Sequence, residues 1–166
     1  MFLLVEAVHA NHKIMTNPIT SPPTLLGFIA WTRAAMGIPT TAIADDNIGY
    51  AYAYQVALDL VPLDFARTSP DIYTLTVYNF GGSNLLGWQQ DIDGQTFFSD
   101  ARLSYGINNF VAGVINSASD VSTSESLSVG AGLQNLDLIS LQAIKNPYGR
   151  QAMAFMQALG TLWGLS

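Results

Sequence analysis

Histidine and cysteine, the residues used most often for nucleophilic and metal chemistry, are scarce in this chain. There is no cysteine, and both histidines, His9 and His12, fall within the first twelve residues. Without cysteine there can be no disulfide, thiolate metal site or cysteine nucleophile. His9 and His12 could share one helical face as a metal pair, although such a pair near a terminus is more often solvated. Hydrolase triads have almost nothing to be built from, so we expect no catalytic site, metal or cofactor.

The segment Asp91-Ile-Asp93-Gly94, followed by Asp100, partly imitates a calcium-binding loop. Asp91, Asp93 and Gly94 would take the third, fifth and sixth loop positions, and Asp100 the twelfth. The first ligand would then be Gln89, and the last would be Asp where the loop needs a bidentate Glu. A tight turn followed by a helix N-cap accounts for the same residues.

Two further groups could carry chemistry but also have plain structural interpretations. Gly81-Gly82-Ser83 lacks the Lys-Ser/Thr ending of a phosphate loop, so we interpret it as a hinge or helix kink. Lys145 and Arg150 flank Pro147-Tyr148-Gly149 and could grip an anion. Cations at helix ends around an interhelical turn explain them equally well.

Helical signals dominate the elements that would position these residues. Ser21-Pro22-Pro23 is a helix-start signal, and the apolar residues after it predict a helix over 24–36 that is central to the core or to an interface. A second helix is predicted over 46–60, ended by Pro62. Ser69-Pro70 starts a third segment reaching toward Trp88, for which β-branched and aromatic residues make a strand the competing interpretation.

The second half of the sequence indicates more helices and, between them, one segment of different composition. Helices are expected over 96–105, closed by Gly106, over 136–145 and over 150–159, the last two separated by a break at 146–149. Between 107 and 132, two short β-prone runs flank a Ser-rich stretch, which predicts a β-hairpin or a long projecting loop. The predicted fold is mainly α: a helical bundle-like single domain over 21–166, preceded by an N-terminal arm over 1–20 in which Met15 could be the natural start.

The composition indicates that the chain is part of an oligomer or a larger assembly. Hydrophobic residues make up 49% of the 166 residues and charged residues only 11%, against about 25% charged in an average soluble domain. So few charges suggest that other subunits cover part of the surface. The net charge of −6 with only six Lys and Arg argues against phosphate-driven nucleic-acid binding. No stretch reaches about 18 uninterrupted apolar residues, so we expect no membrane span.

Several strings resemble a family of small proteins of tailed bacteriophages and prophages. They are Phe28–Pro39, Tyr73–Asn79, Phe110–Val114 with the Ser-rich loop after it, Leu141–Arg150 and Leu162–Ser166. The resemblance covers about residues 24–166. It implies a virion structural protein, assembled in the host cytoplasm, that acts as a head-to-tail adaptor in a ring of twelve below the portal. Its partners would be itself, the portal protein and the tail or neck proteins, and DNA would pass through an acidic lumen without specific binding.

Loop and tail residues are the candidate contacts with neighbouring subunits or the portal. We expect these contacts at Asn116, Asp120, Glu125, Leu127, Leu162, Trp163 and Leu165. The alternatives to a contact role are that the loop is a flexible surface loop and that the tail docks on the protein's own core. Two other functions stay open: a phage-encoded regulator that binds a host protein, and another minor head or tail component.

Overall fold

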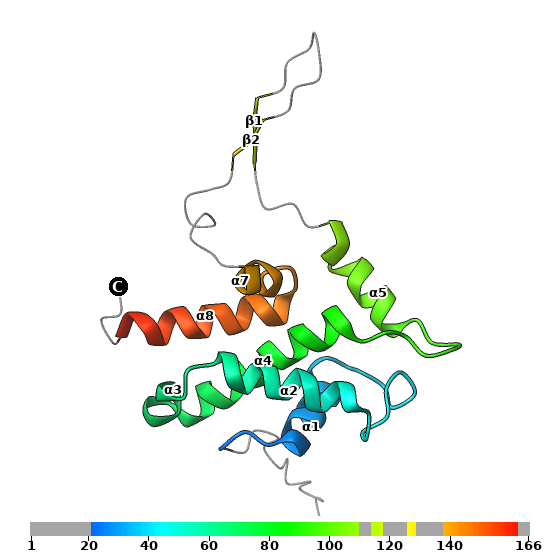
Figure 1. The fold of residues 1–166 in the computed structure, drawn as a ribbon, viewed down its shortest axis with the longest axis horizontal. Helices are drawn as coiled ribbons and strands as arrows, with labels where there is room; N and C mark the ends of the chain where they lie inside the picture. Colours follow the sequence, from blue (N-terminus) through cyan, green and yellow to red (C-terminus); the bar gives the residue numbers. More distant parts are fainter. Residues whose placement is uncertain (1–20, 110–113, 118–125, 129–137, 163–166) are drawn as a thin grey trace, which may run out of the picture.

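The computed structural model describes residues 21–109, 114–117, 126–128 and 138–162 (Figure 1). The described part contains seven α-helices and one short 3-10 helix and is 69% helical, as expected of a mainly α chain. The predicted N-terminal arm over 1–20, with Met15, lies outside it. Among the described helices, none combines the length and the apolar character needed to cross a bilayer.

The first two helices lie close to their predicted ranges. Helix α1 is Leu25–Ala35, and Thr24 caps it by accepting a hydrogen bond from the Gly27 amide at 3.0 Å. Helix α2 is Ile48–Leu60, capped in the same way by Asn47. The cap of α1 is therefore Thr24, three residues after the predicted Ser21.

Helix α4, Pro70–Trp88, forms the centre of the fold (Figure 1). The short helix α3, Asp64–Thr68, precedes it and was not predicted. Proline occupies the first turn of α4, where its missing N–H costs nothing, so the helical interpretation of this segment is confirmed over the strand. Neighbouring helices surround α4 and bury residues on most of its circumference, which is why its apolar and β-branched residues show no amphipathic pattern.

Helix α4 continues through Gly81 and Gly82, so the residues interpreted as a hinge or helix kink do not divide it. A Cβ atom at Gly81 would lie 3.0 Å from the Phe28 ring, and one at Gly82 would lie 2.8 Å from the Met36 sulfur. The two glycines therefore let α1 approach the backbone of α4 closely.

The predicted break between the last two helices exists, but it lies at 144–146 and not at 146–149. Helix α7 is Leu138–Ala143, and α8 already begins at Pro147 and runs to Leu162. The Asn146 side chain accepts a hydrogen bond from the Gly149 amide at 2.9 Å and so caps α8. The residues interpreted as a break are thus a cap, an N1 proline and the first turn of α8, which packs along α4.

The segment from 107 to 132 is described only in part. Ile107–Asn109 form the 3-10 helix η1. Strands β1, Val114–Ser117, and β2, Ser126–Ser128, pair antiparallel with Ile115 opposite Leu127. The residues before, between and after these strands lie outside the described residues, so a hairpin or long projecting loop over this range stays a prediction.

Aromatic rings fill the core between α1, α2 and α4. Phe28 is fully buried, and its ring centre lies 5.9 Å from those of Tyr54 and Tyr78. The Tyr50 ring meets Phe28 edge to face with ring centres 6.1 Å apart, and the Trp31 ring centre lies 6.5 Å from that of Phe28. The predicted central role of the first helix therefore holds for one face only, since Leu26 on α1 is 80% exposed.

Candidate functional site

A cavity of about 550 Å³ lies where the C-terminal end of α4 meets α5, Phe97–Ser104, η1 and the turn between α7 and α8. We call it the α4–α7 cavity. Its volume falls within the range of about 300–1,000 Å³ that is usual for ligand sites. Its described lining residues are Ser83, Asn84, Gly87, Trp88, Arg102, Ile107, Asn108, Gln142, Ala143, Lys145 and Asn146.

Helix α4 presents one face to the cavity, with residues at helical spacing from Ser83 to Trp88. The Nδ2 atom of Asn84 is buried and has no hydrogen-bond partner among the described residues. A buried donor without a partner costs about 1–3 kcal/mol, so such groups are rare in native proteins. Beside Gly87 no atom lies within 4 Å of where a Cβ would stand, which leaves the wall open at that point.

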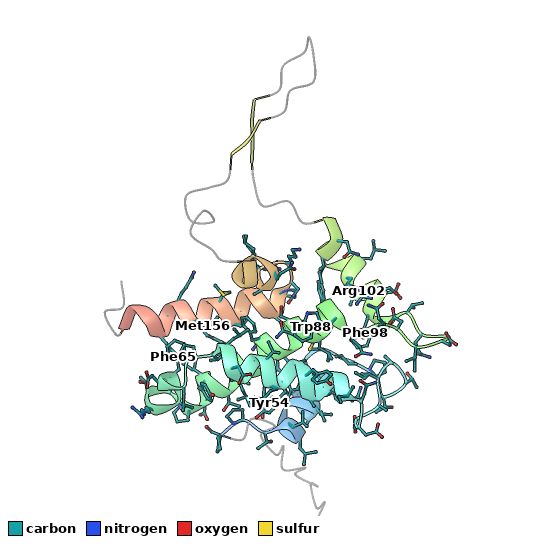
Figure 2. All side chains as sticks on the ribbon, viewed as in Figure 1. Tyr54, Phe65, Trp88, Phe98, Arg102 and Met156 are labelled. Atoms are coloured by element: carbon teal, nitrogen blue, oxygen red, sulfur yellow. The ribbon has the colours of Figure 1, made fainter. Side chains whose placement is uncertain are left out.

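Two cations line the α4–α7 cavity, whereas its described lining residues include no Asp or Glu. Arg102 on α5 uses Nη1 to donate to the carbonyl oxygens of Leu86 and Gln89, at 3.0 and 2.8 Å, and so closes the C-terminus of α4. Figure 2 shows Arg102 beside Trp88, a residue that is 52% exposed. Lys145, in the turn before α8, supplies the second charge.

The cations elsewhere in the described part are already engaged. Arg33 pairs with Asp45 at 2.5 Å, and Arg67 lies 3.6 Å from Asp64. The guanidinium of Arg150 donates to the carbonyl of Ile144 at 3.2 Å, and Arg150 is not a lining residue of the cavity. The expected grouping of Lys145 with Arg150 is thus replaced by a grouping of Lys145 with Arg102.

A buried hydrogen bond joins two of the elements that line the cavity. Asn146 donates from Nδ2 to Ser83 Oγ at 2.8 Å while its Oδ1 caps α8, so one side chain joins the α7–α8 turn to α4. The N-terminus of α8, the positive end of its dipole, therefore lies at the cavity. Nearby, burial and then contact with Tyr105 raise the pKa of Tyr148 to about 12, so this phenol stays neutral at neutral pH.

These features together suit a group that brings hydrogen-bond acceptors and negative charge. Lys145 and Arg102 carry positive charge, and Trp88 provides an apolar surface at the side. A carboxylate entering the cavity could take charge-assisted hydrogen bonds, which are about twice as strong as neutral ones.

The contacts predicted from the sequence lie at the limits of the described residues. Asn116 falls in β1 and Leu127 in β2, where backbone pairing alone is described, and Leu162 is the last residue of α8. Asp120, Glu125, Trp163 and Leu165 lie outside the described residues. None of the seven is a described lining residue of the α4–α7 cavity. Those contacts stay predictions, and the cavity is a separate feature.

The carboxylates of the calcium-like segment are engaged separately. Asp91 accepts hydrogen bonds from the amides of Phe98 and Ser99, at 2.7 and 2.8 Å. Asp100 accepts one from the Thr96 hydroxyl at 2.7 Å. Within the described part of the chain, no three His, Asp or Glu residues gather as metal ligands would. The turn-and-cap interpretation describes this segment, with Asp91 as the residue that caps α5.

Replacing Asp91 with alanine should destabilise the protein in a pH-dependent way. Partial burial alone would raise the pKa of Asp91, but the hydrogen bonds from Ser99 and Phe98 and the charge of Arg102 hold it below its ordinary value. We expect a loss of about 0.5–2 kcal/mol at pH 7, as for other capping residues. Since the folded pKa is lowered, this stabilisation is present above the unfolded pKa of about 3.9 and is lost as pH falls through the folded value.

Urea denaturation of wild type and Asp91→Ala between pH 7 and pH 2.5 measures this effect. The difference between the two proteins should narrow below about pH 4. Asp93→Ala, in the same turn and exposed, should change stability by no more than about 0.5 kcal/mol. A difference that stays constant down to pH 2.5 would show that the charge of Asp91 contributes nothing.

Comparison with known proteins adds no relative to this description. No family model matches the chain, and neither a curated protein nor a solved structure matches it.

Proposed function

We propose that this chain is a structural protein of a tailed-phage virion, a head-to-tail adaptor that assembles into a ring below the portal. The observation that carries the proposal is the amount of large apolar side chain on the surface of a charge-poor protein. The most exposed are Leu26 at 80%, Leu103 at 74%, Leu63 at 69%, Ile48 at 63%, Tyr52 at 60% and Trp88 at 52%. Single exposed apolar residues are normal, but here α1, α2, α4, α5 and the α2–α3 turn each carry one or more.

The acidic net charge of the chain supports a role in which it contacts other proteins and repels DNA. With twelve acidic and six basic residues, a ring of such chains would present an acidic lumen along which DNA slides without sticking. The described acids are largely exposed, whereas two of the described cations face the α4–α7 cavity. This arrangement favours protein contacts over nucleic-acid binding.

The proposal predicts that the purified chain self-associates. Sedimentation velocity and native mass spectrometry at high concentration should find an oligomer. Removing residues 161–166, which include the apolar Leu162 and Trp163, should reduce assembly or portal docking more than it reduces helicity measured by circular dichroism. A chain that is strictly monomeric at high concentration, with or without portal, would refute the ring.

Mass spectrometry of purified virions separates the adaptor from the regulator. An adaptor is present in every particle at a fixed copy number. A phage-encoded regulator would be missing from virions and would instead form a one-to-one complex with one host protein.

A further inference from the structure

We propose that neighbouring copies join head to tail, with the α2–α3–α4 corner of one copy entering the α4–α7 cavity of the next. The corner comprises Asp59, Leu60, Leu63, Asp64 and Asp71. This inference rests on the proposed ring and names the surfaces that would build it. It concerns two patches that lie at opposite ends of α4.

The corner is acidic, apolar and open to solvent. Leu63 is 69% exposed and Leu60 is 37% exposed, and both stand next to exposed carboxylates. The Asp64 side chain is 86% exposed, and its only described ion-pair partner, Arg67, lies 3.6 Å away with 84% of its side chain exposed. Such a surface pair contributes about 0–1 kcal/mol, so Asp64 can exchange it for a partner in another copy at little cost.

The α4–α7 cavity has the complementary chemistry. It offers the charges of Lys145 and Arg102. Trp88 stands half-exposed at its side, where a leucine such as Leu63 could pack. A carboxylate beside an apolar side chain matches this combination better than a purely apolar or purely charged group would.

The positions of the two patches suit head-to-tail assembly. Helix α4 has 19 residues and is therefore about 28 Å long, with α3 at its start and the cavity at its end. Figure 2 shows Phe65 of α3 at one end and Trp88 with Arg102 at the other. Because the patches differ, the contact is heterologous, and every open oligomer keeps one unfilled corner and one unfilled cavity until the ring closes.

Charge also selects a second copy as the occupant. Chains with a net charge of −6 repel one another wherever acidic surfaces meet. The described lining residues include Lys145 and Arg102 and no Asp or Glu. Because Arg102 already acts on Asp91 outside the cavity, Lys145 is the charge that attracts an acidic corner. Assembly should accordingly weaken as salt rises, because screening shortens the reach of these charges.

Two charge reversals test the contact, one on each patch. Lys145→Glu alters the cavity and Asp64→Lys alters the corner. Each should raise the concentration needed for half-assembly at least about tenfold, since like charges then face each other. Asp46→Lys makes the same charge change at an exposed position before α2 and should leave assembly unchanged. Circular dichroism checks that all three variants keep their helices.

Mixing the two variants gives the sharpest result. In the mixture the reversed corner of the Asp64→Lys chain faces the reversed cavity of the Lys145→Glu chain, and the two unchanged surfaces also face each other. An equimolar mixture should therefore recover assembly, with the two chains alternating. Native mass spectrometry, with the two chains distinguished by mass, would count them. Homodimers of either variant would contradict head-to-tail pairing.

The other outcomes show which part of the proposed interface is incorrect. If the wild type assembles and both variants assemble equally well, the ring stands and these surfaces are not its interface. If Lys145→Glu alone blocks assembly, the cavity receives a segment other than the corner. If 10 mM acetate or phosphate raises the melting temperature of the wild type and Lys145→Glu abolishes that shift without affecting assembly, the cavity binds a small anion instead. A wild type that never assembles refutes the ring itself.

Discussion

Replacing Phe28 with alanine is expected to lower the free energy of unfolding by about 3–5 kcal/mol, the range for deleting a large aromatic from a core. Phe28 is fully buried, and four aromatic rings from α1, α2 and α4 lie within 6.5 Å of its ring centre. The Gly81 backbone comes so close to the Phe28 ring that a Cβ there would lie 3.0 Å from it. Truncation would therefore open a cavity that rigid neighbours cannot readily fill.

The control for this change lies two residues earlier on the same helix. Leu26 is 80% exposed, so Leu26→Ala should change stability by less than about 0.5 kcal/mol. Urea denaturation followed by circular dichroism measures both variants. A loss below 1 kcal/mol for Phe28→Ala would mean that the aromatic cluster does not organise the core.

Replacing Gly149 with alanine is expected to cost about 3 kcal/mol or more, at the upper end of the range for overpacking. An added Cβ would collide with the backbone carbonyl of Ala143, and a backbone atom cannot move aside as a flexible side chain can. The first turn of α8 would have to separate from α7. That movement would also strain the Asn146 contact with Ser83, which ties this turn to α4.

Gly87 supplies the matched control. It lies inside α4 with no atom within 4 Å of an added Cβ, so Gly87→Ala should stabilise the protein by about 0.5–1 kcal/mol by improving helix propensity. Thermal and urea denaturation of the two variants should therefore shift in opposite directions. Equal shifts would show that the close approach at Gly149 is absent in solution.

Much of the helical framework could be predicted because its boundaries are set by local chemistry. Ser69-Pro70 starts α4, and Gly106, with a φ of 64°, lies just past the end of α5 in a conformation that favours glycine. The errors occurred where packing decides. Gly81-Gly82 would weaken an isolated helix, but in the fold it lets α1 approach α4. By local sequence preference, Asn146-Pro147 is equally suited to ending one helix and to starting the next.

The candidate site was harder to predict because its residues come from distant parts of the chain. Lys145 could be singled out as a candidate anion ligand, but paired with Arg150, its neighbour in sequence. Its actual companions, Asn84, Trp88 and Arg102, lie 43 to 61 residues away and meet it only after α4, α5 and the α7–α8 turn have packed. The usable signal was the scarcity of cations, because a chain with only six Lys and Arg has few places where two of them can lie together.

The position of α4 also sets an order in which the chain can fold during synthesis. Residues 25–88 contain α1 to α4 and most of the aromatic cluster, so they can collapse through contacts close in sequence while the ribosome is still making the rest. The side of α4 that α8 covers must then stay open to solvent until residues 147–162 emerge. At that stage the nascent chain exposes a face of α4 that is buried in the final fold. Before α8 docks, this face is open to chaperones and to premature association.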